Sequence, residues 1–433
     1  MPDSLQDEAI AVLQRLLRMN TVNPPGNERP AQEYLAGLFE HAGFEVAVLG
    51  PERERPNLVA RLRGRAPGPV LGLLSHVDTV IADPAGWCHD PWSGALDEGC
   101  VWGRGALDMK SQTAAEAVAA CSLAREGWRP ARGDLLVISV SDEEVDGSGA
   151  TWLTAEHPEL VRCDYLLNEG GGESFEVGAD RFHSVCVGEK GVFRFTLSTE
   201  GAAGHASMPM VADNALLKLG PLLQALAERR PGWDVTPPTR GLFEELGLPL
   251  DGDPSAALGA LRERAPEFAF DVEAMLSVTL APTMVDASDS MNVIPARARL
   301  HVDCRVPPGM EEPAALERVR EVIGADGYRL EFTERVVGNA SRPESALMEA
   351  LRGWVERTDP GTRCLPTLSV GYTDSRTFRD AFPDCVAYGF FPHRHMTIEQ
   401  LGALVHGRDE RIDVRDLALA VDCYRSVATE LLG

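Results

Sequence analysis

Three short apolar runs in this chain each lead into a histidine or a carboxylate. The runs cover 71–75, 135–140 and 165–167, and the polar residues that follow them are His76, Asp78, Asp142, Glu143, Glu144 and Glu169. Short continuous apolar runs predict strands buried on both faces, and helical segments between them predict a parallel sheet. Because the carboxyl ends of parallel strands meet at one edge of a sheet, we expect these polar side chains to share one site.

Apolar positions three to four residues apart predict helices around this sheet. The predicted helices cover 4–19, 30–41, 111–125, 345–357 and the segment from about 413 onward, and further strands cover 44–49 and 57–62. Asp3 and Gln6 match a capping box at the start of the first helix. The alternation predicts an α/β fold with a mixed, largely parallel sheet flanked by helices.

The order of elements changes from about Gly188. Predicted strands and helices then follow the order βαββαβ, which is that of the ferredoxin-like split unit; they cover 193–199, 214–226, 275–282, 296–306, 311–323 and 328–334. Since acid-rich strand ends resume after this unit, we expect it to be a second domain inserted into the first. The predicted domains are 1–187, 188–337 and 338–433. Residues 227–274 interrupt the insert with prolines and a short helical piece, to which the sequence assigns no function.

Composition narrows the class of protein. A chain of 433 residues exceeds one ordinary core, which favours two domains. Its formal charge of −25 disfavours nucleic acid and membrane surfaces as partners. No apolar run is long enough to span a bilayer, and the acidic amino terminus does not match a secretory signal. The nine cysteines include no CxxC pair, so we expect free thiols in the cytoplasm.

Two further residues join the candidates at the strand ends. Asp108 precedes an alanine-rich helix, and His406 lies in the loop before the last helix. Two histidines with several carboxylates and no cysteine suit zinc, cobalt or manganese. A pair of such ions, about 3.5 to 4 Å apart, lowers the pKa of water and polarises a carbonyl group. The alternative for His76 is a core histidine paired with a carboxylate.

Adjacent glutamates need separate roles. In extended backbone, successive side chains point to opposite sides, so one of Glu143 and Glu144 can hold a metal while the other acts as general base. The alternative for this pair is a solvated acidic turn. Asp78 is expected to fix the tautomer of His76. The glycines of GRG (103–105) lack the third glycine of a dinucleotide-binding fingerprint, which disfavours a nucleotide-binding oxidoreductase.

Five motifs carry a resemblance to a known family. In order they are SHVDTV, GRGALDMK, SDEEVDGSG, NEG and HGRDE. The series resembles the di-zinc family of aminoacylase, acetylornithine deacetylase, succinyl-diaminopimelate desuccinylase and glutamate carboxypeptidase, over essentially the whole chain. The resemblance implies a zinc-exopeptidase-like catalytic domain with an inserted lid and dimerisation domain. It also implies that His76 and Glu169 hold one ion, Glu144 and His406 hold the other, Asp108 bridges them, Glu143 is the general base and acid, and Asp78 is the orienting carboxylate.

The inserted domain resembles the family as well. Its GAAGHAS matches a lid motif whose histidine, here His205, stabilises the oxyanion in the partner subunit's active site. The resemblance places Asn292, Arg305 and Gly371 against the substrate, and an arginine fork suits a carboxylate. It also implies a homodimer through the lid. Two segments depart from the common pattern, Ser111 after DMK and FFPHRH at 390–395, and the second puts transfer of any one member's specificity in doubt.

The expected function is metal-dependent hydrolysis of an amide bond in a small N-acyl amino acid or short peptide with a free carboxylate. Within this class, a deacetylase or desuccinylase competes with a dipeptidase or carboxypeptidase. A non-catalytic ligand-binding relative is the alternative from another class, although all seven metal and acid–base residues are present.

Overall fold

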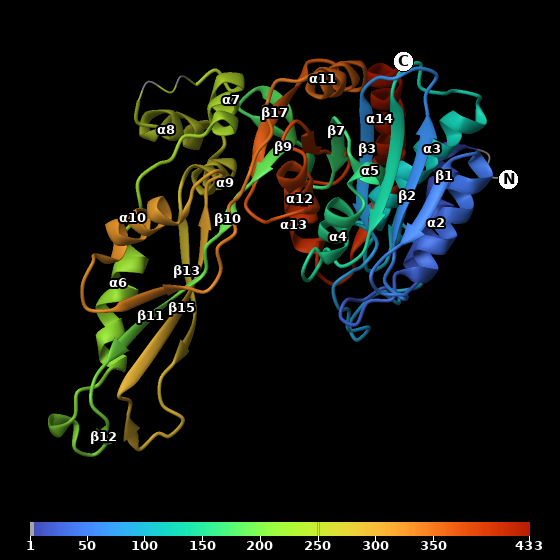
Figure 1. Ribbon diagram of the computed structural model, residues 1–433. Coiled ribbons are helices and arrows are strands. Elements are labelled where there is room, and N and C mark those ends of the chain that lie inside the picture. Colours follow the sequence, from blue (N-terminus) through green and yellow to red (C-terminus); the bar gives the residue numbers. More distant parts are fainter. Residues whose placement is uncertain (1–3, 249, 251) are drawn as a thin grey trace. The chain divides into compact units, whose positions relative to one another are not determined.

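The computed structural model describes residues 4–248, 250 and 252–433 (Figure 1). The chain forms two compact units. Unit 1 contains the described residues up to Val187 together with Ser341–Thr367 and Thr373–Gly433, and unit 2 contains Gly188–Ala340 and Leu368–Tyr372. None of the described helices is long and apolar enough to cross a membrane.

The main sheet of unit 1 has the order β1-β2-β6-β3-β7-β18-β9-β17, with β8 paired to β9. Its strands are β1 (Glu45–Leu49), β2 (Asn57–Arg63), β3 (Val70–His76), β6 (Asp134–Val140), β7 (Tyr165–Asn168), β8 (Gly171–Val177), β9 (Asp180–Glu189), β17 (Thr362–Ser369) and β18 (Val386–Gly389). The central strands β6, β3, β7 and β18 are parallel, whereas β1, β2, β8 and β9 pair antiparallel. The predicted mixed α/β fold is therefore confirmed.

Helices cover both faces of this sheet, which explains why its central strands are continuously apolar. On one face lie α1 (Leu5–Leu17), α2 (Arg29–Ala42), α3 (Lys110–Arg125), α11 (Ala346–Thr358) and α14 (Val414–Leu432), which share one core with Leu71 and Leu73 (Figure 1). On the other face, α4 (Ser148–Glu156), α5 (Pro158–Val161) and α12 (Asp374–Ala381) share a core with Leu74. Neighbouring residues of β3 thus point to opposite faces.

A small antiparallel sheet of unit 1 joins two distant parts of the chain. Its order is β19-β5-β4, formed by Arg411–Asp413, Cys100–Trp102 and Ala95–Asp97. Because β5 precedes Asp108 and β19 follows His406, this pairing brings their loops together.

The first helix, α1, is capped by Ser4, whose hydroxyl accepts a hydrogen bond from the amide of Asp7. Asp3, which was expected in a capping box, lies outside the described residues.

Unit 2 has the strand order of a ferredoxin-like unit. An antiparallel sheet runs β13-β15-β11-β16, with β10 on β15. Its elements are β10 (Gly191–Val192), β11 (Phe195–Glu200), α6 (Gly220–Glu228), β13 (Thr279–Asp286), β15 (Arg297–Val306), α10 (Glu312–Ile323) and β16 (Arg329–Phe332). Buried residues of α6 and α10 share a core with the sheet. The element order is βαββαβ, as the pattern predicts.

Several segments differ from the prediction. The predicted strand at 275–282 begins only at Thr279, because α9 (Pro266–Leu276) continues to Leu276. The segment 227–274 is mostly helical, with α7 (Pro237–Glu245) and α8 (Ser255–Arg264) before α9. These short helices have prolines at or just before their first turn, where proline is tolerated, so prolines that were expected to interrupt structure begin helices instead.

Candidate metal centre

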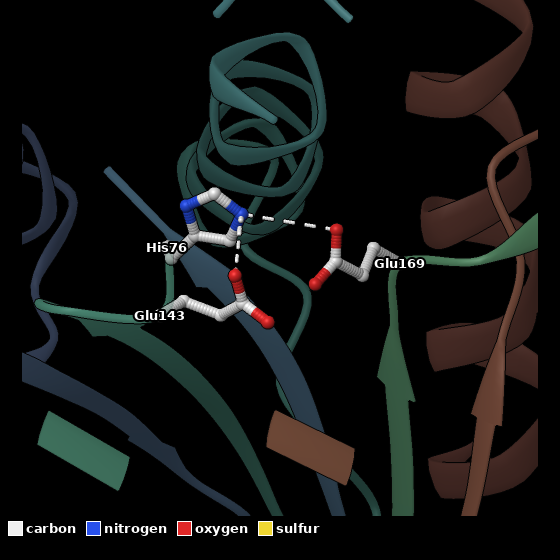
Figure 2. Close-up of side chains that lie close together, drawn as sticks. All are labelled: His76, Glu143 and Glu169. Carbon is white, nitrogen blue, oxygen red and sulfur yellow. Dashed lines mark ion pairs between the residues drawn. The ribbon is translucent and has the colours of Figure 1, made fainter. Parts of the chain in front are cut away.

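The carboxyl edge of the parallel strands gathers the first group of site residues. β3 ends at His76, β7 ends one residue before Glu169, and the turn after β6 carries Glu143 and Glu144. Figure 2 shows the carboxylates of Glu143 and Glu169 directed at the His76 imidazole, with Oε2 atoms 3.9 and 3.7 Å from Nε2. The His76 side chain is 1% exposed, so this group is enclosed.

Asp108 lies between two imidazoles. Its Oδ1 atom is 3.1 Å from His76 Nε2, and its Oδ2 atom is 3.1 Å from His406 Nε2. On the far side, Glu144 Oε2 lies 3.2 Å from His406 Nε2. One carboxylate therefore separates two groups, each with one histidine and one further glutamate.

The two ring nitrogens of His76 have different partners. Its Nδ1 atom lies 3.1 Å from the main-chain oxygen of Asp78. A carbonyl oxygen only accepts hydrogen bonds, so Nδ1 carries a proton. Nε2 faces the Asp108 carboxylate, and this pairing is favourable when a positive charge lies between the two atoms, either a ring proton or a metal cation bound in its place. His406 Nε2 faces Asp108 and Glu144 in the same way.

The pKa values of these site residues reflect the crowding of several carboxylates around two imidazoles. Burial raises the pKa of Glu169 to about 7, and burial together with the charge of Glu169 raises the pKa of Glu143. Hydrogen bonds to Asp108 and Glu144 raise the pKa of His406 to about 10. In His76, burial lowers the pKa, but hydrogen bonds to carboxylates outweigh it and raise the pKa well above its usual value.

The donor set fits two divalent cations. Each imidazole group offers one nitrogen, one glutamate oxygen and one oxygen of the shared Asp108. Three protein donors to each ion leave room for water or substrate, as in catalytic rather than structural zinc sites. Nitrogen and oxygen donors without thiolate suit zinc, cobalt or manganese. Donor atoms of His76, Glu143 and Glu169, and of His76, Asp108 and Glu144, lie within 4.8 Å of one another.

Asp78 contacts both His76 and the acidic turn. Its Oδ1 atom is 3.6 Å from His76 Nδ1, and its main-chain oxygen is 3.1 Å from the same nitrogen. The two carboxylate oxygens also accept the backbone amides of Glu143 and Glu144, at 3.2 Å each. Asp78 is 0% exposed and holds the acidic turn.

Two buried residues that contact the site residues were missed by the sequence reasoning. Glu410 is fully buried and accepts the amides of Leu107 and Asp108, at 2.7 and 3.0 Å, and also pairs with Arg104. Its place in HGRDE was the available signal. Asn23 donates to Asp78, 55 positions away, and nothing in its local pattern signals that contact.

The other predicted residues belong to unit 2. His205 on β12 (Gly204–His205) pairs with β14 (Val293–Ile294), and the Ala206 amide donates to the Asn292 carbonyl oxygen at 3.0 Å. His205 and Asn292 therefore share one tip of the unit (Figure 1). Arg305 lies near the other end of β15, where its Nε atom donates to Asp303 at 2.8 Å. The Gly371 amide donates to the Ser369 hydroxyl at 3.1 Å.

Known proteins match this chain over nearly its whole length. The model of Peptidase family M20/M25/M40 matches residues 72–430. A succinyl-diaminopimelate desuccinylase of Rhodospirillum centenum is 30% identical, over 97% of this chain and 96% of that protein.

Solved structures share the fold at lower identity. An M20 family metallo-carboxypeptidase of Sulfolobus solfataricus has a TM-score of 0.71 at 18% identity, covering 98% of this chain and 99% of its own. A dinuclear metal binding peptidase of the M20 family from Bacillus subtilis has a TM-score of 0.62 at 16% identity, covering 99% and 98%. With the family model spanning both halves of the candidate metal centre, the chain belongs to Peptidase family M20/M25/M40, and it is a metal-dependent hydrolase of amide bonds.

Proposed function

We propose that this protein removes the acyl group from a small N-acyl amino acid that carries a free carboxylate, as a deacetylase or desuccinylase does. The observation that carries the proposal is the Asp108 carboxylate between two imidazoles, each with its own glutamate. The 30% identity to a desuccinylase over almost the full chain supports this acyl class.

The proposed metal ligands divide into two sets. His76 and Glu169 hold one ion, His406 and Glu144 hold the other, and Asp108 contacts both. Zn²⁺ is the proposed metal, with Co²⁺ or Mn²⁺ as alternatives, because the donors are imidazole and carboxylate. When bound, such a pair of ions lowers the pKa of a water molecule and polarises the carbonyl group of the amide.

Glu143 is the proposed general base and acid. Its carboxylate is turned toward His76 and Glu169 (Figure 2). Burial first, and then the charge of Glu169, raises its pKa, which suits a carboxylate that must take up and return a proton near neutral pH. It takes a proton from the attacking water and delivers it to the nitrogen of the leaving amine.

His205 is the proposed donor to the oxyanion. The amide and the hydroxyl of Ser207 lie 3.2 and 2.7 Å from His205 Nδ1. Because the amide can only donate, Nδ1 is an acceptor, and the proton of the neutral imidazole sits on Nε2. An exposed Nε2–H is suited to bind developing negative charge on a substrate oxygen.

Asn292, Arg305 and Gly371 are the proposed contacts of the substrate's carboxylate. Strand β15 separates Arg297 from Arg305 by about 26 Å at 3.3 Å per residue, and the tip with His205 and Asn292 lies at the Arg297 end. One small substrate does not span that length. Its contacts with His205 and with Arg305 therefore come from two different subunits, which supports a His205 that acts in the partner's site.

A homodimer through unit 2 follows from the same reasoning. Strand β13 pairs only with β15 among the described strands, and its Met284 and Val285 are 62% and 48% exposed. Leu217, beside α6 in the same unit, is 74% exposed. An open strand edge with apolar side chains is normally covered by another chain or element.

The proposed location is the cytoplasm. All nine cysteines are free thiols, which supports a reducing compartment.

The test is release of free amine from N-acetyl amino acids, N-succinyl amino acids and dipeptides. Metal-stripped protein is assayed before and after addition of zinc or cobalt. Metal-restored cleavage of an N-acyl amino acid supports the proposal and ranks the acyl groups. Restored cleavage of dipeptides alone assigns a dipeptidase or carboxypeptidase instead, and silence on every substrate with metal bound contradicts a hydrolytic role for these classes.

A further inference from the structure

A segment near the amino terminus lies along the strand end that carries His76. The Asn23 amide donates to the Thr79 carbonyl oxygen at 2.9 Å, and the Thr79 amide donates to the Thr21 carbonyl oxygen at 3.1 Å. This pairing extends the backbone past the end of β3 and sets the Asn23 side chain beside Asp78. Asn23 is 5% exposed, so its amide group depends on protein partners.

Asn23 joins two buried carboxylates. Its Nδ2 atom donates to Asp78 Oδ2 at 2.9 Å and to Asp142 Oδ1 at 2.8 Å. An amide nitrogen has two hydrogens, so each carboxylate receives one. An aspartate at position 23 would offer neither hydrogen and would add a third negative charge, because carboxylates only accept when ionised.

Asp142 is held firmly on its other side. The Arg55 guanidinium donates to Asp142 at 2.8 Å and to Glu28 at 2.9 Å, and Glu28 is fully buried at the start of α2. The Ser148 hydroxyl also donates to Asp142. Asp142 has a φ of 69°, a left-handed conformation that residues other than glycine seldom adopt. These contacts hold the backbone in that conformation just before the two glutamates.

Asp78 continues the connection into the turn. Its two oxygens accept the consecutive amides of Glu143 and Glu144, at 3.2 Å each. Two fixed amides orient the two side chains that leave from them. Glu143 then points to His76 and Glu169, and Glu144 points to His406.

We propose that Asn23 is a positioning residue: by donating to Asp78 and Asp142 at once, it fixes the turn that aims Glu143 and Glu144 at the two halves of the metal centre. The roles of the two glutamates rest on the proposed function. The orientation of the turn does not, because it is a property of the metal-free chain. Residues that orient metal ligands in this way typically change metal affinity or activity by about 10- to 100-fold when replaced.

The test compares Asn23→Ala and Asn23→Asp with Asn20→Asp in the full chain. Asn20 is exposed in the same loop, and its Oδ1 atom accepts the Val22 amide. An aspartate at position 20 keeps that acceptor while adding the same charge as Asn23→Asp. Hydrogen exchange of the Glu143 and Glu144 amides is measured in metal-free protein, and zinc affinity is measured by chelator competition.

Both Asn23 variants are expected to speed exchange of these two amides at least about tenfold and to weaken zinc about 10- to 100-fold, with Asn20→Asp unchanged. In the assay, kcat falls while KM stays within about twofold. Ser148→Ala, which removes a single partner of Asp142, gives a smaller change of the same kind and serves if Asn23→Asp fails to fold. Unchanged exchange and zinc affinity in folded Asn23→Ala overturns the proposal, even if no substrate has been found.

Discussion

The two regions that carry candidate site residues differ in how firmly those residues are held. In unit 1, His76 and Asp78 are 1% and 0% exposed, and hydrogen bonds or ion pairs fix each donor atom. In unit 2, His205 and Asn292 are exposed, and their side chains bond to serines of their own loops. The candidate side chains of unit 1 are therefore preorganised, whereas His205 and Asn292 of unit 2 are open to solvent.

The largest effect is expected for Asp108→Asn. Asparagine replaces one carboxylate oxygen by an NH2 group, which takes a donor from one proposed ion, and it leaves an uncharged amide oxygen for the other, so metal content falls below one ion per chain and turnover becomes undetectable. Metal analysis after dialysis and the amine-release assay measure both. Asp83→Asn is the control, since Asp83 is exposed and its hydrogen bond from the Ala85 amide survives the change. Two tightly held ions in Asp108→Asn would contradict a shared ligand.

Glu143→Gln separates metal binding from proton transfer. The amide keeps the shape of the side chain but cannot take a proton, so we expect kcat to fall by about 10²- to 10⁴-fold with metal content unchanged. Glu156→Gln, at an exposed glutamate of the same unit, leaves both unchanged. Wild-type turnover in Glu143→Gln would remove Glu143 from the mechanism.

His205→Ala tests whether unit 2 acts across subunits. Loss of one oxyanion donor is expected to lower kcat by about 10²- to 10³-fold with normal metal content. Mixed dimers of His205→Ala and Glu143→Gln chains contain one site with both groups intact. Equal mixing should therefore restore roughly a quarter of wild-type activity, given two-fold symmetry and random pairing. Exchange of subunits without any recovery would place His205 in its own subunit's site or outside the reaction.

Arg305→Lys is expected to have the smallest effect. A lysine keeps the charge but loses the planar fork that matches a carboxylate, so KM rises about tenfold while kcat stays within about twofold. Arg299→Lys, at an exposed arginine six residues earlier on the same strand, is the control. A change confined to kcat would argue against a contact that only binds the substrate's carboxylate.

Part of the site could be predicted from the sequence because its residues follow local patterns. The apolar runs of β3, β6 and β7 predict the strands, and the residues at their ends predict His76, Glu143, Glu144 and Glu169, because a parallel sheet brings strand ends to one edge. Asp108 and His406 were chosen for their residue types and their places before helices, and the sequence does not show that a separate small sheet brings their loops together.

Contacts between distant segments leave no local pattern. Asn23 and Asp142 are 119 positions apart, and Glu410 reaches the Asp108 amide across 302 positions. The role of Asp78 was incompletely predicted for the same reason, because spacing shows its nearness to His76 but not its bonds to the turn after β6. Only a short helical piece was predicted where α7 to α9 lie, because prolines at helix starts resemble prolines that break structure.

The central claim is that unit 1 binds two metal ions on either side of Asp108. Anomalous scattering at the zinc absorption edge, measured on crystals of the zinc-loaded protein, tests it most directly. The account predicts two peaks about 3.5 to 4 Å apart, one beside His76 and Glu169 and the other beside His406 and Glu144. A single peak, or two peaks that do not share Asp108, would contradict it.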